Sequence, residues 1–187
     1  MSKTIATKIA EVAVNTKFEN LPEEAVVKAK TLTLDVLASM LGTREVISST
    51  IAREVAEEMG GPAEATIVGS KDKVAAPNAA FANAIQCYGL DFVDDHNESN
   101  AHPSPATFPA SMALSEMLHR SGKEYIEAVS LGNEVVCRMG TAYLGDMYYQ
   151  GFHPTSTCGT MGAAVSAAKL MKLDEQKTVY AQGIAGS

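Results

Sequence analysis

The segment PNAAFANAIQCYG, at positions 77–89, constrains the fold of this chain more than any other stretch. Pro77 suits the first turn of a helix, where its missing N–H group costs no hydrogen bond. The residues that follow it are apolar on nearly every side of that helix, and a helix without a polar face is buried in the middle of its domain. We therefore expect other helices to surround this segment, and the residues after it to emerge directly from the core.

Helical patterns account for most of the rest of the chain. They recur, in chain order, at 5–12, 20–42, 48–59 and 104–119, and in segments that begin near 122, 155 and 174. Only ATIVGSKDKV, at 65–74, is β-like, and it predicts a small hairpin that turns at 70–72. The sequence therefore predicts an all-α fold of about eight helices with one small β-hairpin.

Two of the expected helices show one apolar face, as helices that pack against a core do. In the helix at 48–59 that face is formed by Ile51, Val55 and Met59. In the helix at 20–42 it is formed by Val26, Thr33, Leu34, Leu37 and Leu41.

Composition narrows the functional classes. The chain has 187 residues, of which 46% are hydrophobic, and this suits one globular domain. Its net charge of -7 and the absence of a Lys/Arg-rich run disfavour nucleic acid or an anionic membrane as a partner. No apolar run approaches the ~20 residues of a membrane helix. Three scattered cysteines, Cys87, Cys137 and Cys158, fit small buried residues in a reducing cytoplasm.

The densest polar cluster of the sequence follows the apolar helix directly. It is GLDFVDDHNESNAHPSP, at 89–105, with alanine-rich apolar sequence on both sides. A second stretch, Gly151-Phe152-His153-Pro154, repeats its His-Pro pair. We expect the two stretches to face each other across one site.

Asp91, His102 and His153 are the candidate catalytic residues. Asp91 follows a buried helix by two or three residues, so we expect it to point inward. Each histidine precedes a proline, which biases it out of the helical conformation and into a loop. Histidine exchanges protons near pH 7, and a carboxylate beside it would fix its tautomer and favour the imidazolium. One aspartate with two loop histidines suits proton transfer at a carbon or oxygen centre.

The other charged residues of the polar cluster have simpler interpretations. Asp94, Asp95 and Glu98 suit solvated carboxylates or helix caps. The run at 94–98 also spells DDxxE, a pattern that can hold Mg²⁺ in all-α isoprenoid synthases, but no second acidic motif follows it. Zinc binding through the two histidines of the cluster lacks a third ligand at evident spacing. We therefore predict no metal site.

At these residues the chain resembles the N-terminal part of the MmgE/PrpD family, which includes 2-methylcitrate dehydratase, cis-aconitate decarboxylase and iminodisuccinate epimerase. The matching motifs are LDV at 34–36, PNAAFANA at 77–84, LDFVDDH at 90–96, HPS at 102–104 and GFHPTSTCGTMGAA at 151–164. The resemblance implies that residues 1–187 belong to the large helical domain of this family. That domain would be incomplete at its C-terminal end, and the smaller α+β lid domain would be absent.

Carried over to this sequence, the aspartate of the family's LDF motif falls on Asp91, the histidine of HPS on His102 and that of FHP on His153. The family usually has LDFDD, whereas Val93 is interposed here, so this loop is one residue longer. The resemblance implies chemistry without a metal or organic cofactor, at a site between the two domains. It also implies a homodimer.

The activity that the resemblance implies is that of a lyase, a dehydratase or decarboxylase acting on a small di- or tricarboxylate such as 2-methylcitrate or cis-aconitate. His102 would be the acid/base, oriented by Asp91, and His153 would bind a carboxylate or donate a second proton. The family's later basic residues and its lid are not in this sequence, so we expect little or no activity from 187 residues alone. An epimerase of the same family remains an alternative. So does a non-catalytic truncated or split module that needs a partner chain to supply the lid.

Overall fold

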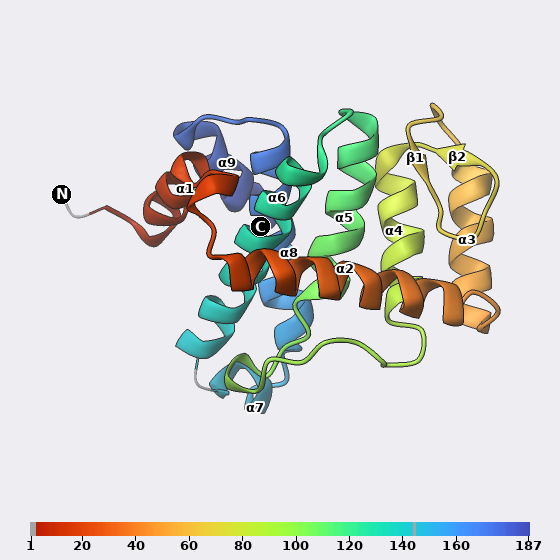
Figure 1. Ribbon diagram of the computed structural model, residues 1–187. Helices are drawn as coiled ribbons and strands as arrows, with labels where there is room; N and C mark the ends of the chain where they lie inside the picture. Colours follow the sequence, from red (N-terminus) through yellow and green to blue (C-terminus); the bar gives the residue numbers. More distant parts are fainter. Residues whose placement is uncertain (1–2, 144) are drawn as a thin grey trace.

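The computed structural model describes residues 3–143 and 145–187 (Figure 1). These residues form nine α-helices, two short 3-10 helices and one two-stranded hairpin. In chain order the elements are α1 (Ile5–Asn15), η1 (Phe18–Asn20), α2 (Glu23–Gly42), α3 (Ile47–Met59), β1 (Ala65–Thr66), β2 (Lys73–Val74), α4 (Ala76–Cys87), η2 (Asn97–Ser99), α5 (Ser104–Met117), α6 (Gly122–Ala142), α7 (Asp146–Tyr149), α8 (Pro154–Leu170) and α9 (Glu175–Ala185). The predicted all-α fold with a small hairpin is confirmed.

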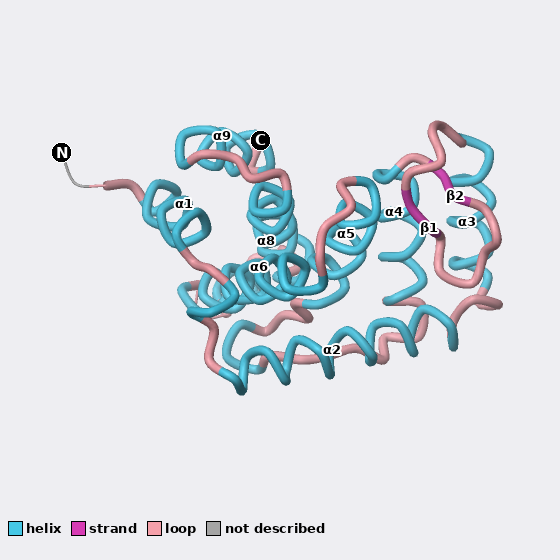
Figure 2. The backbone as a smooth tube through the Cα atoms, turned by 45° about the horizontal axis from the view of Figure 1, so that its top comes forward, coloured by secondary structure: helices cyan, strands magenta, loops and turns pink. Residues whose placement is uncertain are grey.

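Most helices stand side by side in a row. Figure 1 shows α3, α4, α5 and α8 in that order, with α6 against α8 and with α1 and α9 at the far end. Helix α2 runs across this row and contacts α4, α5 and α6, as the turned view in Figure 2 also shows. Among the helices that the structure describes, none combines the length and apolar character needed to cross a membrane.

The central core lies where α2 crosses the row. Val36 and Met40 of α2 lie in one buried cluster with Phe108 of α5, Cys87 of α4 and Val129 of α6. Because Cys87 is the last residue of α4, the chain leaves that helix at the edge of the core. The polar cluster that follows therefore begins next to rigid, close-packed structure.

The buried helix expected before the polar cluster is α4, but one side of it is open, since Phe81 is 49% exposed. The buried amides Asn83 and Gln86 bind the backbone at the end of β1 and just after it. Asn83 Oδ1 accepts from the Val68 N–H at 2.8 Å, and Asn83 Nδ2 donates to the Thr66 carbonyl at 3.0 Å. Gln86 Nε2 donates to the Val68 carbonyl at 3.1 Å. Because buried amide groups need partners, these bonds fix the hairpin against α4.

Helix α8 packs closely on α5 and α6 through glycines. A Cβ atom on Gly162 would lie 2.4 Å from Val136 Cγ2 of α6, and one on Gly159 would lie 2.6 Å from Ala106 Cβ of α5. Real Cβ atoms do not approach other heavy atoms so closely, so only glycine fits at these two positions. Gly159 and Gly162 therefore allow the close packing of α8 on its neighbours.

The apolar face predicted for α3 is exposed to solvent. Ile51, Val55 and Met59 are 52%, 40% and 65% exposed. The side that is buried carries Ala52 and Ala56 instead. Small side chains allow two helices to approach closely, which is why this side of α3 faces α4.

Helix α2 departs from prediction only in part. Leu34 and Leu41 are 70% and 54% exposed, whereas the other three residues of the predicted face are partly buried, and Val26 packs against the central core. The face that packs on the row also includes Val36 and Met40, which the prediction left out.

Candidate active site

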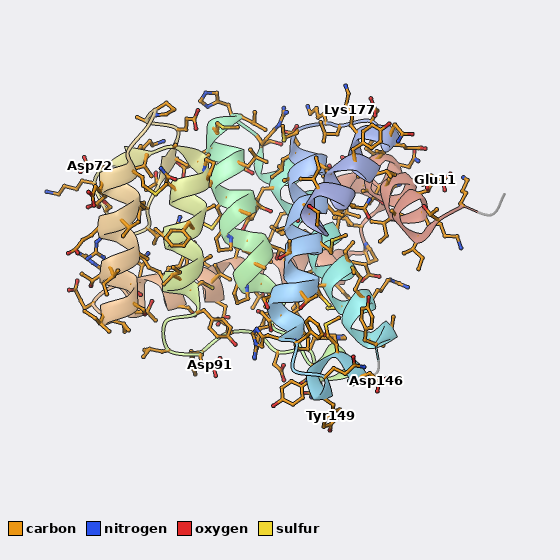
Figure 3. The ribbon with its side chains drawn as sticks, turned by 180° about the vertical axis from the view of Figure 1, so that it is seen from behind. Glu11, Asp72, Asp91, Asp146, Tyr149 and Lys177 are labelled. Carbon is orange, nitrogen blue, oxygen red and sulfur yellow. The ribbon has the colours of Figure 1, made fainter. Side chains whose placement is uncertain are left out.

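The two His-Pro segments meet at one end of the molecule. The polar cluster runs from the end of α4 to the start of α5, and α7 leads into the start of α8. Figure 3 shows Asp91, Asp146 and Tyr149 at this end of the molecule. The backbone N–H of His102 donates to Thr155 Oγ1 at 2.9 Å, so the first segment is joined to the first turn of α8. The two stretches therefore lie together, as the sequence led us to expect.

His102 is held through one ring nitrogen. Its Nδ1 lies 2.8 Å from the carbonyl oxygen of Asp94. A carbonyl oxygen can only accept a hydrogen bond, so Nδ1 carries the proton, and Nε2 of the neutral ring is left as the basic nitrogen. Asp95 Oδ1 lies 3.9 Å from Nδ1 and places a negative charge beside the ring. This geometry suits a residue that takes up and returns protons at Nε2.

Asp94 caps helix α5. Its Oδ2 accepts from the Ser104 hydroxyl at 2.8 Å, and its Oδ1 accepts from the Ser104 backbone N–H at 3.2 Å. Burial raises the pKa of Asp94, while the two bonds from Ser104 act in the opposite direction. The interpretation of Asp94 as a helix cap is confirmed. Its side chain orders α5, and its carbonyl group orients His102.

Asp91 does not point inward, so that prediction is wrong. Its backbone has a positive φ of 54°, its N–H donates to the Tyr88 carbonyl at 3.2 Å, and its side chain is exposed. Aspartate tolerates this left-handed conformation, which turns the chain outward just after α4 ends. Within residues 3–143 and 145–187, no hydrogen bond or ion pair joins Asp91 to His102.

His153 lies at the N-terminal end of α8, where it is exposed. Its carbonyl oxygen accepts from the hydroxyls of Ser156 and Thr157, both at 3.0 Å, which orders the first turn. No side chain caps this end of the helix among the residues that the structure describes. The N-terminal end of a helix carries partial positive charge and unpaired N–H groups, which bind anions such as carboxylates. This end of α8, beside His153, therefore suits an anion.

Sequence reasoning missed two residues that contact His102. Thr155, a buried residue in the first turn of α8, accepts a hydrogen bond from the His102 backbone N–H. The Tyr88 ring lies 5.7 Å from the His102 ring, centroid to centroid, with an interplanar angle of 73°. The one sequence signal for Tyr88 is its place at the end of the buried helix, directly before the polar cluster.

The DDxxE residues have separate structural roles. His96 Nδ1 lies 2.9 Å from the Ser99 hydroxyl, and the His96 N–H donates to the Ala101 carbonyl at 3.0 Å, so His96 orders the turn of η2. Both carboxylate oxygens of Asp94 accept hydrogen bonds from Ser104. In the part of the chain that the structure describes, no three His, Cys, Asp or Glu side chains gather as a possible metal site.

The cysteines are protected thiols. Burial raises the pKa of Cys87 to about 12 and that of Cys137 to about 11, and it also raises the pKa of Cys158. These groups stay protonated near neutral pH and are poor nucleophiles. They behave as small apolar residues, as predicted.

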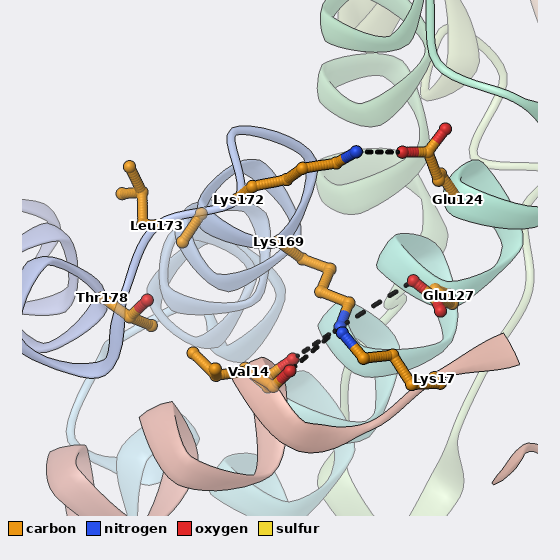
Figure 4. Close-up of a pocket in the computed structure, with 10 residues that line it drawn as sticks. Val14, Lys17, Glu124, Glu127, Lys169, Lys172, Leu173 and Thr178 are labelled. Carbon is orange, nitrogen blue, oxygen red and sulfur yellow. Dashed lines mark hydrogen bonds and ion pairs between the residues drawn. The ribbon is translucent and has the colours of Figure 1, made fainter.

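A cavity of about 400 Å³ lies away from this end, between α1, α6, α8 and α9 (Figure 4). Lys169, one of the lysines that line this cavity, is nearly buried. It donates to the Ala13 carbonyl at 2.9 Å and to the carbonyl of Thr16. Lys169 Nζ also lies 3.8 Å from Glu127 Oε2. Because its bonds go to the backbone at the end of α1, Lys169 fastens that helix to α8 rather than facing a ligand.

Comparison with known proteins identifies the fold. Residues 7–187 match the model of the MmgE/PrpD N-terminal domain. The chain therefore belongs to the MmgE/PrpD family.

Three curated relatives are cis-aconitate decarboxylases or are named after them. The chain is 32% identical to cis-aconitate decarboxylase of Homo sapiens and 30% identical to that of Mus musculus, with the whole chain aligned in each case. It is 27% identical to cis-aconitate decarboxylase-like protein oryM of Aspergillus oryzae over 90% of its length. The chain spans only 40%, 39% and 37% of these proteins, respectively.

Proposed function

We propose that this chain supplies the acid–base part of a lyase site that acts on a small di- or tricarboxylate of the cis-aconitate type. The observation that carries the proposal is the bond from the His102 N–H to Thr155 Oγ1, which joins the two His-Pro segments. It brings a histidine with a defined tautomer to the uncapped end of a helix. The names of the relatives support decarboxylation over the other reactions of the family.

Decarboxylation of such a substrate breaks the bond between a carbon atom and a carboxyl group. Carbon dioxide leaves, and the electron pair remains on an allylic carbanion that must gain one proton. We assign delivery of that proton to Nε2 of His102, which first takes it up from water to form the imidazolium. Nδ1 keeps its own proton, which it donates to the Asp94 carbonyl, so delivery to the carbanion returns the neutral ring. Proton transfer by a positioned side chain contributes about 10²–10⁴-fold to a rate.

The remaining substrate carboxylates need positive partners. The N-terminal end of α8 with His153 offers one. Against this, Asp91, Asp95 and Glu98 place negative charge on the polar cluster of a chain with net charge -7. We therefore propose weak substrate binding and little turnover by this chain alone, with further basic groups supplied by a lid on the same or a partner chain. A homodimer stays a prediction.

The proposal is tested by titrating the 187-residue chain with cis-aconitate while recording the NMR signals of its histidine rings. We expect the His102 and His153 signals to move and the His119 signal to stay, because His119 lies just beyond the opposite end of α5. His102→Gln identifies its signal, and His119→Gln is the matched control. Sodium sulfate at equal ionic strength corrects for screening. Unmoved His102 and His153 signals at millimolar cis-aconitate would remove the substrate class from the proposal.

The alternative is a non-catalytic module that functions only as part of an assembly. The exposed apolar face of α3 is the observation that favours it. If cis-aconitate leaves every histidine signal in place while the chain sediments as a stable oligomer, the module is the better description. Carbon dioxide release from cis-aconitate that depends on His102 would exclude it.

A further inference from the structure

Two of the predicted catalytic residues, Asp91 and His102, are not directly bonded to each other in the described part of the structure. Asp91 is exposed, and no bond or ion pair of the described residues connects it with His102. Yet both residues contact Tyr88, His102 through the Tyr88 ring and Asp91 through the Tyr88 backbone. This residue has no role in the chemistry proposed above.

The backbone of Tyr88 is held in place by helix α4. It is the C-cap of α4, and its backbone N–H donates to the Ala84 carbonyl at 3.2 Å. The preceding residue, Cys87, is fully buried in the central core. Tyr88 is therefore fixed at its backbone by packed helix and projects a half-buried ring into the polar cluster.

The Tyr88 ring contacts the imidazole of His102. The two ring centroids are 5.7 Å apart, and the planes meet at 73°. Edge-to-face pairs at this distance are attractive and prefer a defined relative orientation. The bond from Nδ1 to the Asp94 carbonyl fixes one edge of the imidazole but leaves it free to tilt about that bond. Contact with a second ring removes that freedom.

The backbone of Tyr88 contacts Asp91. The Tyr88 carbonyl accepts from the Asp91 N–H at 3.2 Å, so the two residues close one turn. Partial burial raises the pKa of Tyr88, and the nearby Asp91 and Asp95 carboxylates raise it further. The phenol therefore stays protonated at neutral pH and can donate to a carboxylate, which only accepts.

We propose that Tyr88 is a positioning residue of the candidate site, which fixes the tilt of the His102 imidazole through its ring and connects that imidazole to Asp91 through its hydroxyl. The proposal rests on the proposed role of His102 as the acid/base. It gives Asp91 an indirect role: the carboxylate orients the phenol, and the phenol orients the histidine.

The test uses the 187-residue chain without substrate, so it is independent of any turnover. Long-range ¹H–¹⁵N spectra report the tautomer and tilt of the His102 ring, whose signals His102→Gln assigns. Tyr88→Leu removes the ring, and we expect it to abolish the ring-current displacement of the His102 protons and to introduce the Nε2–H tautomer. Tyr88→Phe keeps the ring and should preserve both features. Tyr180→Phe is the matched control, because the Tyr180 side chain is exposed on α9.

The role of the hydroxyl is tested by a double-mutant cycle, which isolates the energetic coupling of two residues. Asp91→Asn should change the balance between the two tautomers of the His102 ring, and in the Tyr88→Phe background that change should fall by half or more. The other groups that face the ring, the Asp94 carbonyl, the Asp95 carboxylate and Thr155, are the same in all four proteins.

Two results would overturn the proposal. One is a His102 spectrum that is unchanged in Tyr88→Leu while circular dichroism shows the chain folded. The other is an equal effect of Asp91→Asn with and without the Tyr88 hydroxyl. If instead Tyr88 positions His102 as expected but cis-aconitate moves no histidine signal, the proposed function fails and the positioning inference stands.

Discussion

The packing of α8 on α6 predicts opposite effects for one chemical change at two glycines. At Gly162 an added Cβ would lie 2.4 Å from Val136 Cγ2 and 2.7 Å from the Gly132 carbonyl oxygen. Val136 is fully buried, and the carbonyl belongs to helical backbone, so neither can move aside easily. At Gly183 in α9, nothing lies within 4 Å of the added atom.

The magnitudes follow from two competing terms. Replacing glycine by alanine inside a helix gains about 0.8–1 kcal/mol of free energy of folding. Overpacking a close helix contact costs about 1–3 kcal/mol, and two approaches below 3 Å place Gly162→Ala in the upper part of that range. We therefore expect a net loss of about 1–2 kcal/mol for Gly162→Ala. For Gly183→Ala, near a helix end, we expect a gain of about 0.5–1 kcal/mol.

The assay is thermal unfolding followed by circular dichroism. In a chain of this length, 1 kcal/mol corresponds to about 2–4 °C in Tm, so Tm should fall by about 2–8 °C in Gly162→Ala and rise by about 1–4 °C in Gly183→Ala. Adding Val136→Ala to Gly162→Ala should cost less than the sum of the single changes, because it removes the atom that clashes. Equal rises in Tm for both alanine variants would refute the close approach of α6 and α8.

Three further predictions concern other parts of the molecule. The Ser121 N–H at 2.8 Å, Lys172 and the Ser121 hydroxyl hold the pKa of Glu124 at about 2 instead of 4.5. The ionised Glu124 contributes stability that is present above about pH 4.5 and is lost as the pH falls toward about 2. Glu124→Gln should therefore weaken the fall of the urea unfolding midpoint over this pH range. Lys169→Met removes the positive charge beside the buried Glu127, which keeps its bond from the Phe18 N–H, and it also removes the bonds to the end of α1. We expect a cost of about 3–5 kcal/mol in urea unfolding, with Lys169→Met/Glu127→Gln costing less than the sum; a loss below about 1 kcal/mol would contradict the role given to Lys169. Ile51→Thr, on the exposed face of α3, should change stability by no more than about 0.5 kcal/mol, whereas Ala56→Leu on its buried face should lose about 1–3 kcal/mol, and the reverse order would show that the packed face is misplaced.

The elements and the meeting of the two His-Pro segments could be predicted because local chemistry determines them. Pro77 and Pro154 both lie in the first turn of a helix. A turn separates β1 from β2, although it lies at 68–69, closed by the bond from the Ser70 N–H to the Ile67 carbonyl, rather than at 70–72. The His-Pro motif also occurs twice, each time directly before a helix of the packed row, α5 and α8, and these two helices contact each other. Its two copies could therefore be expected at one end, where the bond from His102 to Thr155 joins them.

The partner of His102 could not be predicted, because it is a main-chain atom. A sequence shows which side chains carry carboxylates, and reasoning from side chains selects Asp91 as the residue that orients the imidazole. The structure uses the carbonyl oxygen of Asp94, a group that every residue possesses. The left-handed conformation of Asp91, which sends its side chain outward, is likewise a property of the turn rather than of the residue type. Tyr88 contacts His102 from a position that carries no motif.

The large apolar residues that α2 and α3 leave exposed show a second limit of prediction from the sequence. Hydrophobic periodicity identified both helices correctly, because an apolar stripe at helical spacing occurs wherever a helix packs against something. It could not identify the packed face, because a close helix contact needs small side chains more than large ones, as Ala52 and Ala56 show on α3. The larger Ile51 and Leu34 are left on the outside. A hydrophobic stripe therefore predicts that a helix exists, whereas the distribution of alanine and glycine predicts which neighbour it approaches.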